Sequence, residues 1–439
     1  MGLLIGVGGS KPSFAYDYYY GIEWDMTVKN GIPKRVGKME LHKSLPLQSM
    51  MRRCLLDDQG NVTNYLDAND SSRYDNGSAS DLTGASGQYM VELPDVYVKF
   101  EIDGNLCRHL QSPYPLPGFH LWRKDYISAV EATVQRSTNK LCAVVNKDPD
   151  FRGGGNQKDW DALPKTMLGK PATSISLTNF RAYARKRGTT EWNCQLYQTY
   201  RKLWWLFAVE YCTFDSQSDF NAGLTEEGFH QGGLGAGVTD LDGSKWSAFS
   251  GYNPVIPCGI TNSLGNKTGV VDYAMPKEYD EVIKTTHVPS YRGVENPFGH
   301  IWKWTDGCKC IIQSETSGGL SKFFVCDNPD AFASSGLVDY NHKGNLPRGN
   351  GYVKALLLGE DGEIMPKEVG GGSTVYFHDY FYTSVPTDGE SERGVLFGGI
   401  AYYGASAGFV FARTNDSPSA TGAYFGSRLC FYPNRGAEK

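Results

Sequence analysis

The sequence has little of what marks an exported or membrane protein. Its first residues, MGLLIGVGGSKPSF, hold too few apolar side chains and no basic region, so they predict neither a signal peptide nor a membrane span. Its ten cysteines are scattered and lack the dense, regular spacing of a secreted disulfide scaffold. We therefore expect a chain that folds in a reducing cytoplasm and inserts into no membrane.

The chain also lacks an excess of positive charge. Lys and Arg number 43 against 48 Asp and Glu, which gives a net charge of -5. Proteins that bind nucleic acids or anionic membranes present clustered Lys and Arg. The longest basic cluster here, Arg181 to Arg187, falls on the solvated face of a predicted helix. We therefore expect no nucleic-acid partner.

Glycine and aromatic residues are abundant instead. The chain of 439 residues contains 52 Gly and is 13% aromatic, which favours an architecture rich in loops. One stretch, 67–88, consists almost entirely of small and polar residues, so it predicts a flexible linker or a long loop. It would separate an N-terminal attachment or assembly region, 1–66, from a large domain over 89–439.

Alternating apolar residues predict strands in both parts of the chain. Ile22, Trp24 and Met26 alternate with polar residues, which predicts a small β-rich region near the N-terminus. Val96, Val98 and Phe100 share one face of a second predicted strand, and Asp103-Gly104 predicts the turn that follows it. The run 126–145 is rich in β-branched residues and is also predicted to be extended.

Two helices stand out by their periodicity. The first follows Ser176, a good N-cap, and stops at Gly188, whereas the second covers about 194–211 with an apolar stripe. From 215 to 350 regular patterns fade, and we expect mainly loops there. The fold class expected is therefore α+β, with antiparallel strands and two principal helices.

The window 394–431 sets bulky or polar side chains, one or two at a time, into a frame of Gly, Ala and Ser. It contains no Lys, Glu, Gln, Trp or Met, the set that codons restricted to C or T at the third base cannot encode. Rigid aromatic rings combined with adaptable polar groups are what recognition loops use. The window therefore predicts an interchangeable binding surface.

This window resembles the variable region of proteins diversified by diversity-generating retroelements, in which mutated template adenines are copied into the end of the gene. The matching residues are Gly398-Gly399, Gly404 to Gly408 and the closing run Gly426 to Phe431. The resemblance implies that variable, ligand-binding positions are Ile400, Tyr402, Tyr403, Ser406, Phe409, Phe411, Arg413, Asn415, Asp416, Ser419, Thr421, Tyr424 and Phe425.

The segments SLTNFRAYARKRG, LWWLFAVEY, SQSDFNAGL and EGFHQGGLGAGV are similar to the C-type lectin subclass related to formylglycine-generating enzymes. That resemblance implies a C-type lectin fold and a phage tail protein that contacts a bacterial surface protein or glycan receptor. It further implies a virion location, contact with other virion proteins through 1–66, and a homotrimer. A prophage-encoded or cell-surface bacterial adhesin with the same face is the main alternative, and an enzyme of the formylglycine-generating type is a second one.

Catalysis and metal binding are not expected. The run Gly404 to Gly408 matches the G-x-S-x-G elbow of hydrolases, but no histidine follows it in the chain. Enzymes of the formylglycine-generating type use a cysteine pair near the C-terminus, whereas this chain has Cys430 alone there. One acidic residue in the window, Asp416, is too few for calcium, and Cys308-Lys309-Cys310 departs from zinc spacing. We expect no cofactor.

Overall fold

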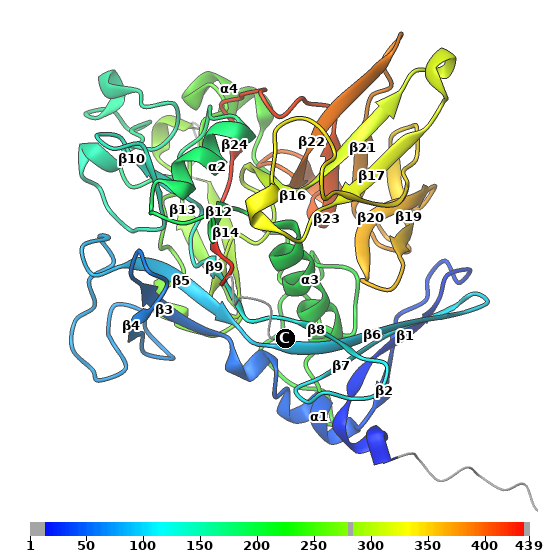
Figure 1. The fold of residues 1–439 in the computed structure, drawn as a ribbon. Helices are drawn as coiled ribbons and strands as arrows, with labels where there is room; N and C mark the ends of the chain where they lie inside the picture. The colour runs from blue at the N-terminus through cyan, green and yellow to red at the C-terminus, as the bar shows by residue number, and fades with distance from the viewer. Residues whose placement is uncertain (1–13, 280–283, 434–439) are drawn as a thin grey trace, which may run out of the picture.

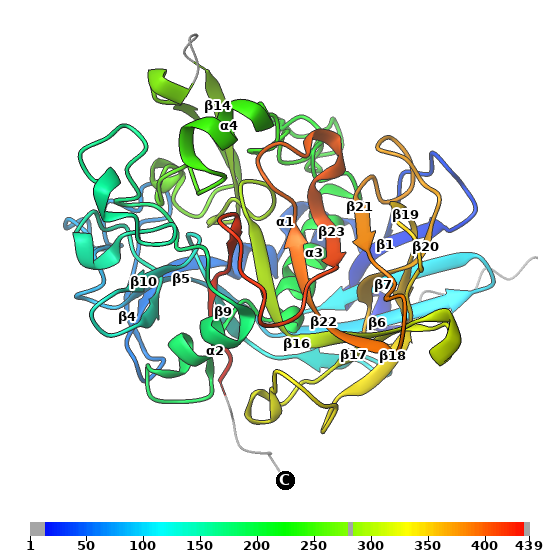
Figure 2. The ribbon, with the colours of Figure 1, turned by 90° about the horizontal axis from the view of Figure 1, so that it is seen from above.

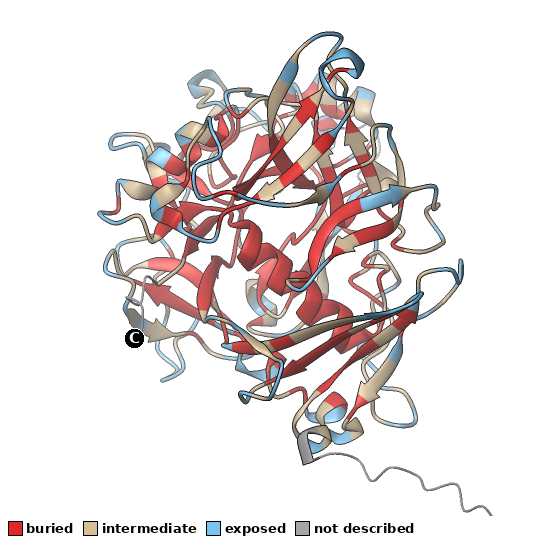
Figure 3. Ribbon diagram, turned by 45° about the vertical axis from the view of Figure 1, so that its right-hand side comes forward, coloured by how far each residue is buried: buried red, intermediate tan, exposed pale blue. Residues whose placement is uncertain are grey.

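Helix α3 (Tyr197–Tyr211) lies in the middle of the molecule, and all its residues are buried. The structure is a computed structural model and describes residues 14–279 and 284–433. Figure 1 shows one sheet below α3 and a larger sheet above it, and Figure 3 shows the helix buried along its length. A helix covered on every side needs no polar face, which is why LWWLFAV runs through its centre.

Two antiparallel sheets contain the N-terminal strands. The first has the order β2-β1-β7-β6-β8, and the second has the order β12-β25-β9-β5-β3-β4. Their bounds are β1 Tyr20–Asp25, β2 Lys34–Gly37, β3 Arg52–Leu56, β4 Val62–Tyr65, β5 Gln88–Leu93, β6 Val96–Asp103, β7 Leu106–Ser112, β8 His120–Trp122, β9 Asp125–Ser128, β12 Trp192–Cys194 and β25 Leu429–Phe431. The short helix α1 (Met39–Ser44) follows β2.

The expected boundary at residue 66 does not separate two sheets. Strand β1 pairs with β7 along its whole length, and β3 pairs with β5, which pairs in turn with β9. Residues 20–66 therefore share both sheets with later residues, so composition misplaced the boundary. Residues 1–13 of the expected N-terminal region lie outside the described residues.

The polar segment 67–88 is a loop held against the body of the protein. Ser71 and Leu82 are buried, and the backbone amide of Ser71 donates to the carbonyl of Asn262 at 2.8 Å. The guanidinium of Arg53 donates to the hydroxyls of Ser71 and Thr261 at 2.9 Å each. Distant residues thus hold this segment in place. Of the two alternatives that the sequence predicts for 67–88, a flexible linker and a long loop, the structure has the long loop.

The C-terminal third forms a sheet of nine strands in the order β18-β17-β16-β22-β23-β21-β19-β20, with β24 beside β16. Most pairs are antiparallel, but β21 and β23 run parallel, as do β16 and β24. The bounds are β16 Trp302–Gln313, β17 Ser321–Val325, β18 Asn341–Asn345, β19 Gly351–Leu358, β20 Glu363–Val369, β21 Tyr380–Thr383, β22 Glu390–Gly398, β23 Gly408–Thr414 and β24 Phe425–Gly426.

The region 215–350 is more regular than its sequence indicates. It contains β16 to β18, the sheet of β13 (Gly269–Ala274), β14 (Thr285–Tyr291) and β15 (Val294–Glu295), and helix α4 (Gly243–Ser250). Strand β16 is the central case, because residues 302–310 are buried on both faces. A strand buried on both faces shows no alternation, so its sequence carries no period of two.

Other sequence expectations are confirmed. Helix α2 (Leu177–Arg185) begins after Ser176, whose hydroxyl accepts from the amide of Asn179 at 3.2 Å. Strands β9, β10 (Thr133–Gln135) and β11 (Lys140–Cys142) make the run from Tyr126 extended. The chain is mostly β-structure with a few helices, which agrees in outline with the α+β class. In the described part of the chain, no helix is long and apolar enough to span a bilayer.

Candidate ligand-binding face

The window 394–431 crosses one face of the molecule before it returns to the core. It runs through β22, a short 3-10 turn (Gly404–Ser406), β23, a loop over 415–424, β24 and β25. Figure 2, seen from above, shows this orange-to-red ribbon between α4 and β21. Sheet pairing through β22, β23 and β25 thus holds the window, and the segments between these strands present side chains.

Backbone groups of the window are held by partners outside it. The amide of Gly404 donates to the carbonyl of Thr239 at 2.7 Å. The side-chain amide of Gln217 donates to the carbonyls of Gly404 and Ala407 at 3.0 and 2.8 Å. Because these bonds use main-chain atoms, they fix the turn whatever side chains it carries.

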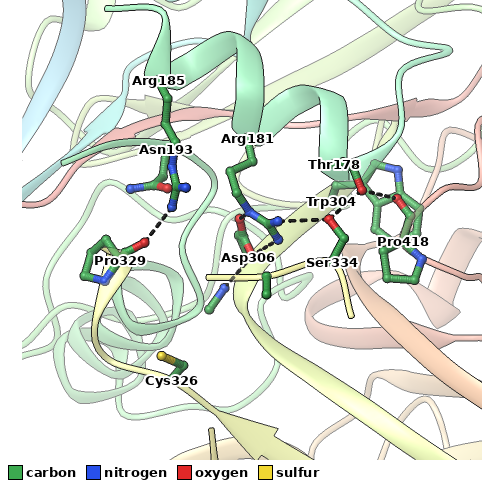
Figure 4. Close-up of polar contacts among 12 residues, drawn as sticks. Thr178, Arg181, Arg185, Asn193, Trp304, Asp306, Cys326, Pro329, Ser334 and Pro418 are labelled. Atoms are coloured by element: carbon green, nitrogen blue, oxygen red, sulfur yellow. Dashed lines mark hydrogen bonds and ion pairs between the residues drawn. The ribbon is translucent and has the colours of Figure 1, made fainter. Parts of the chain in front are cut away.

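Helix α2 holds the far loop of the window (Figure 4). The hydroxyl of Thr178 lies 2.8 Å from that of Ser334 and 3.5 Å from the carbonyl of Pro418, which also accepts from the amide of Thr178. The helix itself is joined to β16 by Arg181, which forms a bidentate pair with buried Asp306 at 2.5 and 2.8 Å. This pairing ties the loop, through α2, to the buried strand β16.

A buried charge network lies beneath the start of the window. The carboxylate of Glu131 accepts from His300 at 2.5 Å and pairs with Lys303 at 2.9 Å, and all three are buried. Burial alone would raise the pKa of Glu131, but His300 and Lys303 outweigh it and lower the pKa to about 2. The carbonyl of His300 accepts from the amide of Ala401 at 3.1 Å.

The structure divides the predicted variable positions into two groups. Ile400, Phe409 and Phe411 are 0% exposed and Phe425 is 3% exposed, so their prediction as contact residues is corrected. Nine positions are partly or fully exposed and could contact a ligand: Tyr402, Tyr403, Ser406, Arg413, Asn415, Asp416, Ser419, Thr421 and Tyr424.

Phe409 lies on β23, where four successive residues, 409–412, are all 0% exposed. Its ring packs 5.5 Å from that of Phe207 and 5.7 Å from that of Tyr200, both on α3. The carboxylate of Asp379 accepts from the amide of Val410 at 2.7 Å. A Cβ on Gly408 would lie 1.9 Å from this carboxylate, so the strand can start only with glycine.

Seven tyrosines form a continuous row across the face. Neighbouring rings in the row have centroids 4.9 to 6.0 Å apart, and every ring is at least partly exposed. In spatial order the row is Tyr352, Tyr380, Tyr382, Tyr403, Tyr402, Tyr252 and Tyr424. Tyrosine rings offer rigid contact area with a polar tip, which suits recognition of a large partner.

Four of these tyrosines lie outside the window and were not among the predicted site residues. The sequence around Tyr380 and Tyr382 could have predicted these two residues. In a strand with a period of two they share one face, and Phe381 between them is buried on the other. Tyr252 and Tyr352 carried no comparable signal. They reach the row only through the tertiary fold.

The polar positions of the face are partly paired. Arg413 donates to Asp416 at 2.6 and 3.2 Å, and its guanidinium lies 5.4 Å from the centre of the Phe425 ring. Burial first and the neighbouring Tyr402 second raise the pKa of Tyr403 to about 12, so this ring keeps its proton. The face therefore presents the neutral phenol of Tyr403 beside the internally compensated pair of Arg413 and Asp416.

The remaining chemical motifs have structural surroundings. The sequence Gly404 to Gly408 forms a 3-10 turn that enters a strand, whereas a hydrolase elbow joins a strand to a helix. Cys430 lies fully buried in β25, and burial raises the pKa of its thiol to about 12. Cys308, Cys310 and Cys326 are also buried free thiols. Within 14–279 and 284–433, no group of three or more His, Cys, Asp or Glu is placed to hold a metal ion.

Comparisons with known proteins identify no family for this chain. No protein-family model matches it, and neither does any curated protein. Similar solved structures include PvdO from Pseudomonas aeruginosa, at 11% identity and a TM-score of 0.34, covering 79% of this chain and 95% of that one. Two others are variants of the Major Tropism Determinant.

The U1 variant is 11% identical with a TM-score of 0.24, and the similarity covers 70% of this chain and 50% of that one. The I1 variant is 12% identical with a TM-score of 0.24, covering 81% and 73%. Such low TM-scores assign no fold to this chain.

Proposed function

We propose that this chain is a diversified ligand-binding protein of C-type lectin fold whose tyrosine-rich face contacts a receptor on a bacterial surface. The observation that carries the proposal is the difference between the backbone and the side chains of the window. Its backbone is held by partners outside it, whereas nine of its side chains are at least partly exposed. A surface built in this way accepts exchanged side chains without loss of the fold.

The window resembles retroelement variable regions, and that resemblance indicates how its side chains are exchanged: mutated template adenines are copied into the end of the gene. By this proposal the protein is a phage tail component that folds in the host cytoplasm and then acts on the virion. The N-terminal residues would contact other virion proteins, and a homotrimer would give several weak sites a useful joint affinity. The receptor is a surface protein or a glycan, and no cofactor, metal ion or catalysis takes part.

Binding to whole cells tests the proposal. Labelled protein is applied to a panel of bacterial strains, and bound label is measured by flow cytometry. We expect at least one strain to bind, and the double variant Tyr402→Ala/Tyr403→Ala to bind more than about 10-fold less, because central tyrosines are typical hot spots. Tyr114→Ala is the matched control, since Tyr114 is 56% exposed but lies outside the row.

Two results would contradict the proposal. One is binding by the double variant equal to that of the wild-type protein on the same strain. The other is an equal loss with Tyr114→Ala, because that would indicate a nonspecific role for exposed tyrosines.

A further inference from the structure

Four tyrosines of the row lie outside the window 394–431: Tyr252, Tyr352, Tyr380 and Tyr382. Tyr252 follows α4, Tyr352 lies in β19, and the other two lie in β21. Figure 2 shows the ribbon of the window between α4 and β21. By the function proposed above, exchange is confined to the window, so these four side chains stay the same when the window changes. We call them the fixed tyrosines.

Fixed tyrosines lie on both sides of the exchangeable ones. Tyr402 and Tyr403, both window residues, have ring centroids 5.1 Å apart at the centre of the row. The ring of Tyr382 lies 5.8 Å from that of Tyr403, and the ring of Tyr252 lies 5.9 Å from that of Tyr402. A partner that covers the two exchangeable rings therefore lies within one ring spacing of a fixed tyrosine on either side.

Tyr252 has a strained backbone conformation. Its φ is +62°, in the left-handed region that a bulky side chain rarely adopts. The residue before it, Gly251, is the left-handed C-cap of α4. The residue after it, Asn253, is fixed, because its carbonyl accepts from the indole of Trp246 at 2.7 Å and from the hydroxyl of Ser250 at 3.2 Å. Strain of this kind concentrates at functional sites, which indicates a role for the Tyr252 ring beyond packing.

Tyr380 and Tyr382 are positioned by the sheet and the core. Strand β21 pairs in parallel with β23, where Tyr382 lies opposite Arg413. The rings of Tyr380 and Tyr382 lie 6.1 and 5.7 Å from that of Phe411, which is 0% exposed. These contacts use the backbone of the window and one of its buried residues. The two fixed rings therefore keep their places when the exposed side chains of the window change.

The fixed tyrosines also have polar groups to offer. The hydroxyls of Tyr252, Tyr380 and Tyr382 make no hydrogen bond with any other residue that the structure describes, and none of the three is fully buried. The hydroxyl of Tyr352 lies 3.2 Å from that of Ser406 in the window. A phenol hydroxyl both donates and accepts, so three fixed hydroxyls remain for a partner.

We propose that the fixed tyrosines are a constant part of the receptor-binding face and contact every receptor that the protein recognises, whichever side chains its window carries. This inference rests on the function proposed above. The fixed tyrosines supply affinity that is common to all receptors, whereas the window residues between them decide which receptor is bound. Receptors of chains with different windows therefore share an element that hydrogen-bonds to phenol hydroxyls.

The test compares two chains that carry different windows. The nine exposed window positions are randomised, and whole cells of two bacterial strains serve as the probes that select one chain each. Tyr252→Asn and Tyr382→Ala are then introduced into both chains, and bound label is measured by flow cytometry. Asn adopts the left-handed backbone more readily than Tyr does. We expect each substitution to weaken binding more than about 10-fold in both chains.

Two further variants separate binding from folding. Tyr382→Phe keeps the ring against Phe411 and removes only the hydroxyl, so its Tm should equal that of the unsubstituted chain while its binding falls in both chains. Tyr114→Ala, which removes an exposed ring outside the row, should leave binding unchanged in both.

The outcomes distinguish this inference from the function on which it rests. Loss of binding in one chain only would make the fixed tyrosines part of a single specificity and would overturn the inference alone. Unchanged binding of both chains after Tyr252→Asn and Tyr382→Ala would also overturn it alone. If no randomised chain binds either strain, the proposed function is contradicted and the inference with it.

Discussion

Phe409 and Tyr402 are both aromatic residues of the window, but they lie in opposite environments. Phe409 is 0% exposed and contacts α3, whereas Tyr402 is 39% exposed. Removing a buried phenylalanine leaves a cavity, so Phe409→Ala should lower the free energy of unfolding by about 3–5 kcal/mol. Tyr402→Ala should lower it by less than about 1 kcal/mol.

Urea denaturation of the two variants measures this difference directly. Equal losses of unfolding free energy in the two variants would mean that Tyr402 contributes as much to the core as Phe409 does. The nine exposed positions would then not be interchangeable.

His109 provides a second prediction at the scale of the residue. Its ring stacks on that of Phe100 at 4.5 Å, and burial lowers its pKa from 6.5 to about 3. The folded state therefore resists protonation of this ring. The stability that His109 contributes is fully present above pH 6.5 and is lost as the pH falls from 6.5 towards 3.

Replacement by phenylalanine removes this titration. Relative to His109→Phe, the wild-type protein should lose about 3 kcal/mol of unfolding free energy between pH 7 and pH 4. Chemical denaturation at a series of pH values gives the difference. A difference that stays constant over this range would contradict the buried, neutral state of the ring.

At the scale of the element, the 3-10 turn Gly404–Ser406 depends on one side chain from a distant loop. Gln217→Ala removes both of its bonds to the turn, at Gly404 and Ala407. We expect a loss of about 1–2 kcal/mol and faster amide exchange over 402–407, because the freed carbonyls no longer hold the turn.

Hydrogen exchange with mass spectrometry reports this change. Gln231→Ala is the matched control, since its amide bonds to Gly223 in another loop. Unchanged exchange over 402–407 in Gln217→Ala would show that other contacts suffice to hold the turn.

The elements that could be predicted are those with local signals. Ser176 marked the start of α2, and the alternation of Ile22 and Trp24 marked β1, because a cap and a half-buried strand leave their pattern in neighbouring residues. Strand β16 left none, since it is buried on both faces. The partners that hold the window, Gln217 and Thr239, lie far away in sequence and could not be inferred from composition.

The same limit applies to the site itself. The frame of small residues predicted Tyr402 and Tyr403 as binding positions, and both are at least partly exposed. The same pattern could not separate them from buried Phe409 and Phe411. Both sides of β23 are buried: Phe409 packs against Phe207 of α3 and Phe411 against Trp302, and the window contains neither partner.

At the scale of the whole molecule, strands from early and late in the chain share one sheet. Strand β25, which closes the window, lies between β12 and β9, and β3 from the N-terminal part lies two strands further on. Arg428 beside β25 donates to the carbonyls of Ser128 and Asn296 at 3.0 and 2.7 Å. The window therefore begins in one sheet, through β22, and ends in another, through β25.

Deep sequencing of the 3′ end of this gene in a natural population tests the central claim most directly. The account predicts substitutions concentrated at the nine exposed positions, matching adenines in a nearby template repeat, with only apolar exchanges at Ile400, Phe409, Phe411 and Phe425. A window no more variable than the rest of the gene, or polar substitutions at the four buried positions as frequent as at the exposed ones, would contradict it.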